Sequence, residues 1–315
     1  MSATARRVLR VTGFLVLLVV AGGAVLYAAF PGVVARGLQK AQRASLGLSR
    51  QEVTLPSGTV PYLEGGSGTP LVLLHGFAAD KDSWFAIAGQ LAERYRVIIP
   101  DLAGFGESTV DAGGDYRPVT QAGRVHEFLR ALDLGPVHLA GWSMGGQIAG
   151  HLAHDHPEAV RSLVLIVTGG LATDTVTPRG RAMLAGTASL LATNRAELDE
   201  LLTTVMEVPG PVPSVIKRVV LAETQRRRPT WDSVFAQMVA PESVSSLDGV
   251  APGIAVPTLV FWGERDVLLH VAMGRRLAGR IPGALFVSLP DCGHGCPMSR
   301  PEETLRVILG FLDAH

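Results

Sequence analysis

A serine in a glycine-rich turn is the first residue whose setting points to chemistry. Ser143 lies in the run GWSMG at 141–145, which fits the pattern G-x-S-x-G. In that pattern a strained turn between a strand and a helix exposes the serine hydroxyl, so that a nearby base can activate it. Small residues on either side let the strand and the helix approach closely. Because the chain contains 36 glycines, the pattern also fits an ordinary turn and needs partners elsewhere.

An acid and a histidine follow Ser143 in the order that such a site requires. Asp266 comes after a predicted strand at 258–262, and His294 after one at 284–289. Loops at the carboxyl ends of parallel strands meet at one edge of the sheet, so these side chains can reach the serine. His294 would take the serine proton, while Asp266 fixes the imidazole tautomer and stabilises its charge. We therefore predict Ser143, Asp266 and His294 as the catalytic residues.

Other acids and histidines compete for the same roles. Glu264 and Asp291 lie in the same two loops, where we interpret each as a turn residue. Five more histidines are interpreted as packed or solvated side chains: His138, His151, His154, His156 and His270. The predicted acid and base therefore remain Asp266 and His294.

Two backbone N–H groups are the predicted donors to an oxyanion. Met144 directly follows the serine, and Phe77 lies just past the strand predicted at 71–74. Donors in these positions stabilise the negative charge that develops on the carbonyl oxygen of an ester. The side chain of Phe77 is then free to line an acyl pocket.

Strands that alternate with helices position these residues. The alternation predicts a parallel sheet with helices on both faces. The predicted strands are 53–56, 60–63, 71–74, 97–99, 137–140, 163–167, 258–262 and 284–289. The predicted helices are 83–95, 119–132, 147–152, 272–280 and a last one from Ser299, where Ser299 and Glu302 would form a capping box.

The segment from Thr168 to Ala255 interrupts this alternation. Its apolar residues recur at helical spacing, and prolines punctuate it. We predict a helical cap at about 169–254, inserted between two strands of the sheet. The run Arg226-Arg227-Arg228 is interpreted as a solvated face of one cap helix.

An apolar run of twenty uncharged residues, Val11–Phe30, lies near the amino terminus. Twenty helical residues span about 30 Å, the thickness of the hydrocarbon core of a bilayer. A cleaved signal sequence is the alternative, but Tyr27-Ala28-Ala29 offers a large residue where a small one is expected. We predict an uncleaved anchor, followed at 33–48 by a helix that lies on the membrane surface or serves as a linker. Basic residues on both flanks leave the side of the membrane open.

The chain thus divides into two predicted parts, an anchor with a basic linker at 1–50 and a catalytic domain at 51–315. Residues 1–50 carry seven basic side chains and no acid, although the net charge of the whole chain is zero. The catalytic part is therefore negative, which argues against a nucleic-acid partner. Its two cysteines, Cys292 and Cys296, have no further thiols for a metal site, and both a disulfide and free thiols remain open.

These motifs together resemble the α/β-hydrolase superfamily. The matching segments are HGF at 75–77, DKDSW at 80–84, DLAGFGES at 101–108, GWSMGG at 141–146, GERD at 263–266 and GH at 293–294. With its anchor, the chain is most similar to membrane-anchored monoacylglycerol lipases of the α/β-hydrolase-domain type and related bacterial lipases. The resemblance implies a mostly parallel eight-stranded sheet with an inserted helical cap. It also implies hydrolysis of medium- or long-chain acyl esters without a cofactor or a metal.

The predicted function is therefore a membrane-anchored serine hydrolase of lipid-like carboxylic esters that forms an acyl-enzyme on Ser143. The same residues can serve a short-chain esterase, a carbon–carbon bond hydrolase or a perhydrolase, because a fold does not fix the substrate. Dehalogenases and epoxide hydrolases use an aspartate where this chain has serine. A non-enzymatic, membrane-tethered binding module would lack a catalytic residue, and none is missing. The acyl length, the alcohol and the oligomeric state stay open.

Overall fold

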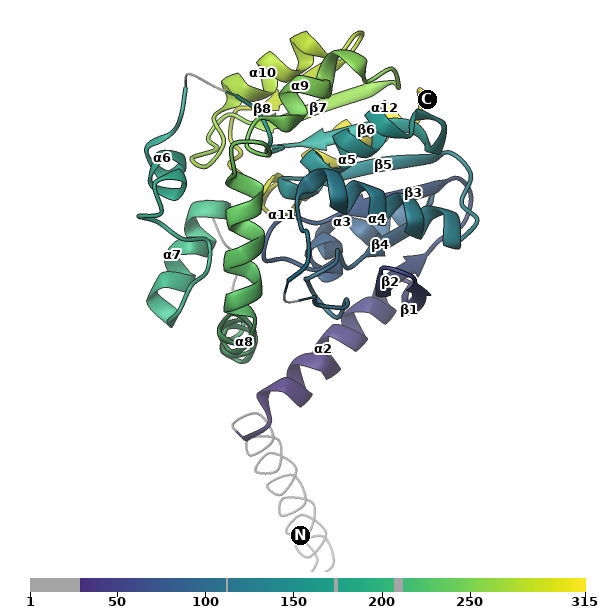
Figure 1. The fold of residues 1–315 in the computed structure, drawn as a ribbon. Helices are drawn as coiled ribbons and strands as arrows, with labels where there is room; N and C mark the ends of the chain where they lie inside the picture. Colours follow the sequence, from purple (N-terminus) through teal and green to yellow (C-terminus); the bar gives the residue numbers. More distant parts are fainter. Residues whose placement is uncertain (1–28, 112, 173–174, 207–211) are drawn as a thin grey trace, which may run out of the picture.

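An eight-stranded sheet forms the centre of the molecule (Figure 1). The computed structural model describes residues 29–315 except 112, 173–174 and 207–211. The strand order is β1-β2-β4-β3-β5-β6-β7-β8, in which β2 pairs antiparallel with β1 and β4 and the other neighbours are parallel. The strands are β1 Leu48–Leu55, β2 Gly58–Gly65, β3 Pro70–Leu74, β4 Arg96–Pro100, β5 Val137–Trp142, β6 Val160–Ile166, β7 Thr258–Gly263 and β8 Leu285–Leu289. The prediction of a mostly parallel sheet is confirmed.

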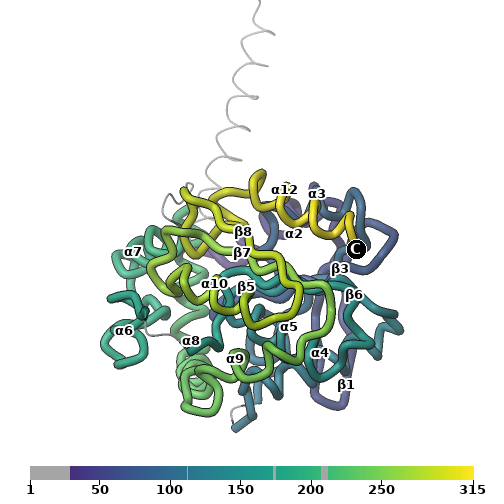
Figure 2. The backbone as a smooth tube through the Cα atoms, turned by 90° about the horizontal axis from the view of Figure 1, so that it is seen from above, coloured from purple at the N-terminus to yellow at the C-terminus, as the bar shows by residue number. Residues whose placement is uncertain are grey.

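Helices cover both faces of this sheet, with α3 and α12 on one face and α4 and α5 on the other (Figure 2). Every residue of β5 and of β7 is buried. Parallel strands covered on both faces carry continuous apolar runs, which is why these segments lack the alternation of a half-exposed strand. The helices outside the insertion that follows β6 are α3 Phe85–Ala92, α4 Pro118–Ala131, α5 Met144–Asp155, α10 Val271–Arg280, α11 Cys296–Ser299 and α12 Pro301–Leu312.

A group of helices between β6 and β7 stands beside the sheet (Figure 1). It consists of α6 Pro178–Leu184, α7 Arg195–Met206 and α8 Ser214–Val239, followed by the short α9 Ser246–Val250. The predicted helical insertion between two strands is therefore present, and we call α6, α7 and α8 the cap.

The interpretation of the cap arginines is wrong for the middle one. Arg226 is exposed and Arg228 is half-buried, but Arg227 is only 7% exposed. Its guanidinium pairs with Glu223 and donates to the carbonyl oxygens of Gly104 and Gly106 in the loop after β4. Successive residues on a helix point in different directions, so a run of three arginines cannot lie on one face.

The amino-terminal helix α2 (Pro31–Ser45) packs against α8 of the cap. Arg43 near its end forms an ion pair with Asp82 at 2.6 Å. The predicted anchor Val11–Phe30 lies outside the described residues except for its last two positions. Among the described helices, none is both long and apolar enough to cross a membrane.

The predicted start of the last helix is also wrong. Helix α12 begins at Pro301, and Ser299 ends the short preceding helix α11. The Ser299 hydroxyl donates to the carbonyl oxygen of Gly295 at 3.1 Å, so it does not cap α12. Proline at the first helical position fits a helix start, because its missing N–H group has no partner there in any case.

Candidate active site

Ser143 lies in the turn between β5 and α5 with a strained backbone. Its φ is 57° and its ψ is −117°, a backbone conformation that residues other than glycine rarely adopt. A Cβ on Gly141 would lie 2.2 Å from the carbonyl oxygen of Gly145, and one on Gly145 would lie 2.4 Å from that of Leu74. Both positions therefore require glycine, and the sharp turn predicted from the sequence is present.

Asp266 and His294 form a buried hydrogen-bonded pair. Asp266 Oδ2 lies 2.8 Å from His294 Nδ1, and the two residues are 4% and 6% exposed. The other oxygen of Asp266 accepts the backbone N–H groups of Leu268 at 2.8 Å and Leu269 at 2.9 Å, which fixes the carboxylate. Trp142 Nε1 donates to the carbonyl oxygen of His294 at 2.9 Å and holds the histidine loop beside the serine turn. A carboxylate that accepts from Nδ1 leaves Nε2 to take a proton.

The competing residues make other contacts. Glu264 accepts from Ser288 Oγ at 2.7 Å, and Asp291 pairs with Arg265 on the surface. His270 caps α10 by accepting the N–H of Ala272 at 3.2 Å, although it also lines a cavity beside Ser143. Of the three acids considered, the structure therefore brings only Asp266 to His294.

Two of the other histidines are buried away from the serine. His138 bonds through Nδ1 to Ser162 Oγ at 2.7 Å, and burial lowers its pKa to about 4. His151 is 4% exposed and lies 2.7 Å from Ser246 Oγ. Of the two alternatives for these histidines, packed or solvated, the structure has both of them packed.

The loop after β3 lies against the serine turn. A Cβ on Gly76 would come within 3.3 Å of the Cβ of Ser143, which places the Gly76–Phe77 segment beside the serine. Met144 begins α5, whose N-terminal N–H groups point toward a site where negative charge is stabilised. The two predicted oxyanion donors, Phe77 and Met144, thus belong to segments that flank Ser143 from two sides.

His75 holds this loop in place, a role that sequence reasoning missed. Its Nε2 accepts the N–H of Leu102 at 3.0 Å, so Nδ1 carries the proton and donates to the carbonyl oxygen of Gly76 at 2.8 Å. Complete burial lowers the pKa of His75, which keeps the ring neutral. The HGF motif at 75–77 was the available signal, but it gave no indication of the ring's two partners.

A buried ion pair fixes the segment that follows this loop. Lys81 Nζ lies 2.6 Å from Asp101 Oδ2, and both side chains are almost fully buried. Burial acts to lower the pKa of Lys81, but attraction by Asp101 and the neighbouring acids raises it above its ordinary value. Nearby, desolvation and then the charges of Asp82 and Asp101 raise the pKa of Asp80 to about 7. The ion pair of Lys81 with Asp101 thus joins the segments DKDSW and DLAGFGES.

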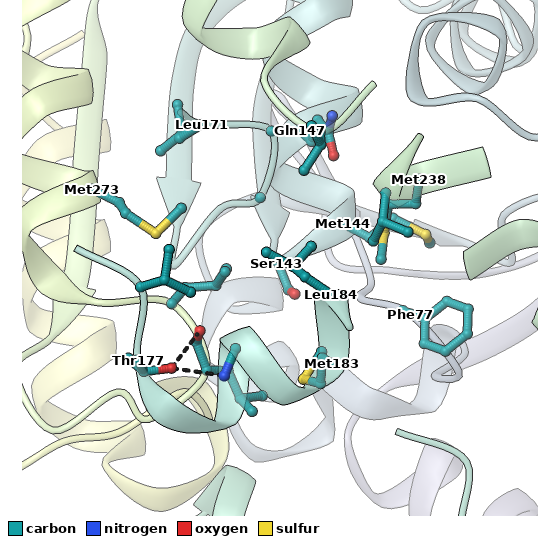
Figure 3. Close-up of a pocket in the computed structure, with 18 of the residues that line it drawn as sticks. Phe77, Ser143, Met144, Gln147, Leu171, Thr177, Met183, Leu184, Met238 and Met273 are labelled. Atoms are coloured by element: carbon teal, nitrogen blue, oxygen red, sulfur yellow. Dashed lines mark hydrogen bonds between the residues drawn. The ribbon is translucent and has the colours of Figure 1, made fainter. Parts of the chain in front are cut away.

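Two apolar cavities meet at Ser143, of about 130 Å³ and about 300 Å³. They share Phe77, Ser143, Leu190, Leu268 and His294. The first extends toward α6 and the end of α8 and is shown in Figure 3, where Ser143 lies between Met273 and Phe77. The second extends toward α7. Among the described residues, no Asp, Glu, Lys or Arg side chain lines either cavity.

The cap, the segments that flank it and the loops around Ser143 all contribute to the linings of the two cavities. The first is lined by Leu171, Met183, Leu184, Phe235, Met238, Val239, Val244 and Met273 among others. The second is lined by Ala79, Trp142, Leu198, Leu201, Leu202, Val205, Met206, Val220 and Met298 among others. Methionine is flexible and polarisable, so such walls adapt to an alkyl chain.

A disulfide joins Cys292 to Cys296 on either side of His294. Both cysteines are fully buried. Of the two alternatives that the sequence left open, the structure has the disulfide, and it closes the short loop that carries His294.

Known proteins match this chain over most of its length. The model of the family described as alpha/beta hydrolase fold matches residues 69–208. Lipase 1 of Psychrobacter immobilis is 32% identical over 84% of each chain. Human monoacylglycerol lipase ABHD6 is 31% identical over 78% of this chain and 76% of its own. The crystal structure of a membrane phospholipase A, described as a bacterial virulence factor, superposes with a TM-score of 0.87 at 34% identity over 97% of this chain and 98% of its own.

Proposed function

Because the chain belongs to the α/β-hydrolase family and is a carboxylic-ester hydrolase like its lipase relatives, we propose that it is a serine lipase for esters of lipid-like acyl chains, of the monoacylglycerol lipase type. The observation that carries this proposal is the pair of apolar cavities that meet at Ser143. A site for small polar esters would not require two apolar cavities in which none of the described lining residues is Asp, Glu, Lys or Arg.

Ser143, His294 and Asp266 perform the reaction in this proposal. His294 Nε2 takes the proton of the Ser143 hydroxyl as its oxygen attacks the ester carbonyl. The resulting oxyanion is stabilised by the N–H groups of Phe77 and Met144. His294 then gives its proton to the leaving alcohol, and an acyl group remains on Ser143. Water, activated by the same histidine, hydrolyses the acyl-enzyme and regenerates the serine.

The cavities supply the binding energy for an alkyl chain. Each methylene moved from water into an apolar site contributes about 0.8 kcal/mol. Several carbons of acyl chain therefore outweigh a single neutral hydrogen bond, which contributes about 1 kcal/mol. The proposal thus predicts that kcat/KM rises with acyl length from acetate to at least octanoate in a p-nitrophenyl ester series.

The experiment combines that series with labelling of the nucleophile. Ser143→Ala should lower turnover by roughly four to six orders of magnitude and abolish fluorophosphonate labelling. Ser83→Ala is the matched control, because Ser83 lines one cavity but lies in the short 3-10 helix η1 (Lys81–Trp84) before α3. Labelling that persists in Ser143→Ala would refute the nucleophile, and a series that peaks at acetate would leave a short-chain esterase.

Esters with two alkyl chains are a second candidate substrate, favoured by the larger cavity. In monoacylglycerol the alcohol side of the ester is a small polar glycerol, which does not match a cavity of about 300 Å³ walled by Leu and Val side chains. A second chain would fill it. Comparing 1-octanoylglycerol with 1,2-dioctanoylglycerol at equal surface concentration decides between the two, because the second candidate requires faster cleavage of the diester.

The proposed membrane anchor is residues 11–30, and the proposed catalytic domain starts near residue 51. The packing of α2 on α8 and the ion pair of Arg43 with Asp82 indicate that α2 is attached both to the cap and to the segment before α3. Two truncations separate these roles. A protein starting at Pro31 should be soluble and active on short esters, whereas one starting at Gln51 also lacks α2 and the first residues of β1 and should be less stable. An insoluble, inactive product from both would contradict the proposed domain division.

A further inference from the structure

Three side chains that can bind a metal come together at the end of α5 far from Ser143. They are His126 on α4, His156 directly after α5, and Glu158 in the short helix η2 (Pro157–Ala159). Their ligand atoms all lie within 4.8 Å of one another, and among the described residues this is the group of His, Cys, Asp and Glu side chains that does so. Ligand atoms around one zinc ion lie at most about 4 Å apart, since each bond is about 2 Å long, so small side-chain movements would bring these three to the required distances.

The backbone already holds these three residues in place. Helices α4 and α5 pack against each other along their length. The N–H of His156 donates to the carbonyl oxygen of Leu152 at 2.8 Å, and the carbonyl oxygen of His156 accepts the N–H of Ala159 at 3.0 Å. His156 is therefore fixed at the end of one helix and Glu158 in the turn that follows, so little chain entropy is lost when a ligand binds.

The three side chains lie close together. The rings of His126 and His156 stack with centroids 3.6 Å apart and an angle of 22° between their planes, so one ring must turn before both direct a nitrogen at the same ion. His156 Nδ1 lies 3.3 Å from Glu158 Oε1.

We propose that His126, His156 and Glu158 bind one divalent transition-metal ion of the zinc class, with solvent completing its coordination. Two imidazole nitrogens and one carboxylate oxygen suit Zn²⁺, whereas Mg²⁺ and Ca²⁺ prefer sets made of oxygen atoms alone. The ion would fasten α4 to the turn after α5. Since α5 has twelve residues, this site lies about 18 Å along the helix from Ser143 and takes no part in ester cleavage.

Calorimetric titration of the untagged full chain with Zn²⁺, after removal of metals by a chelator, tests this proposal. We expect one zinc ion per chain with a dissociation constant in the micromolar range or tighter. His126→Ala and His156→Ala should each weaken binding at least tenfold. His154→Ala is the matched control, because His154 bonds to Asp155 at 2.7 Å and lies outside the group. Zinc should also raise the Tm of the wild type but not of His126→Ala.

Three results would overturn the proposal. One is the absence of stoichiometric zinc binding by the wild type at 100 µM, about a hundredfold above a micromolar dissociation constant. The second is equal binding by the wild type and His126→Ala, and the third is an equal loss in His154→Ala. Because the proposed metal site is independent of the site at Ser143, His126→Ala should hydrolyse the octanoate ester at the wild-type rate. Failure of the metal proposal would therefore leave the proposed lipase activity unaffected.

Discussion

The edge of the sheet and the cap meet at Ser143 but are built in different ways. At the sheet edge, β5 and β7 are buried along their whole length, and Asp266 and His294 are each fixed by hydrogen bonds at 3.0 Å or less. In the cap, only five of the 26 residues of α8 are buried. The sheet edge therefore holds reacting groups rigidly, while the cap offers an adaptable apolar wall.

The cap is held to the sheet by a few polar contacts. Arg227 donates to the carbonyl oxygens of Gly104 and Gly106, and Trp231 Nε1 donates to that of Gly104 at 3.2 Å. At the start of α6, the Thr177 hydroxyl donates to the carbonyl oxygen of Val267 at 2.6 Å. Because the two regions differ in this way, we infer that the sheet edge determines the chemical step and the cap determines which esters bind. Changes at the sheet edge should alter turnover for every ester, and changes in the cap should alter it only for some.

The largest expected effect is at the sheet edge. Asp266→Asn should lower turnover about 10⁴-fold for short and long esters alike, because an amide at this position favours the wrong imidazole tautomer. Initial rates with acetate and octanoate esters would measure it. Asp291→Asn is the control, since Asp291 is exposed and paired with Arg265. If the loss in Asp266→Asn depended on acyl length, the sheet edge would also contribute to substrate choice, which would contradict the proposed division of roles.

A smaller and selective effect is expected in the cap. Leu202 on α7 lines the larger cavity, and Leu202→Trp should fill part of it. Excluding about three methylenes should lower kcat/KM for a dioctanoyl ester roughly 50-fold, at about 0.8 kcal/mol each, and leave acetate hydrolysis unchanged. Thr203→Trp, at the exposed next position of the same helix, is the control. Equal losses on both esters would show that the cap also positions the reacting groups.

The attachment of the cap should be visible in stability. Arg227→Ala removes the Arg227 donor to the carbonyl oxygen of Gly106 and one of the two donors to that of Gly104, and should lower the free energy of unfolding by about 1–3 kcal/mol. Arg226→Ala, one position away and exposed, should change it by less than about 0.5 kcal/mol. Urea unfolding of both variants measures the difference. Similar values would mean that Arg227 does not fasten the cap.

The smallest expected effect is a pH dependence at the sheet edge. The pKa of Asp80 is raised from 3.8 to about 7 in the folded protein, so the folded state holds a proton that the unfolded state releases between these values. The contribution of Asp80 to stability is therefore present below pH 4 and is lost as pH rises toward 7. Because this side chain is partly exposed, we expect a loss of about 1 kcal/mol between pH 5 and 8.

Asp80→Asn tests this pH dependence, because an amide is neutral at every pH. In urea unfolding at pH 5 and pH 8, the variant should lose less stability than the wild type over this interval. Asp111→Asn, in an exposed turn, is the control and should follow the wild type. An unchanged pH dependence in Asp80→Asn would assign the effect to other groups.

Short patterns in the sequence were sufficient for the order of the elements. The apolar runs of β5 and β7, the glycines around Ser143 and the helical spacing of the cap can each be recognised within a few consecutive residues. Such patterns follow the backbone period and the local geometry of each element. For the same reason the sequence predicted that an acid and a histidine would follow the serine in separate loops.

Which of these side chains contact one another depends on the tertiary structure. Glu264, Asp266 and Asp291 fit the sequence pattern of an acid in these loops, but the fold places Asp266 alone against His294. The burial of Arg227, the two cavities and the group at His126 likewise depend on packing between segments far apart in the chain. Contacts of this kind are set by the positions of whole helices and strands, which no local pattern contains.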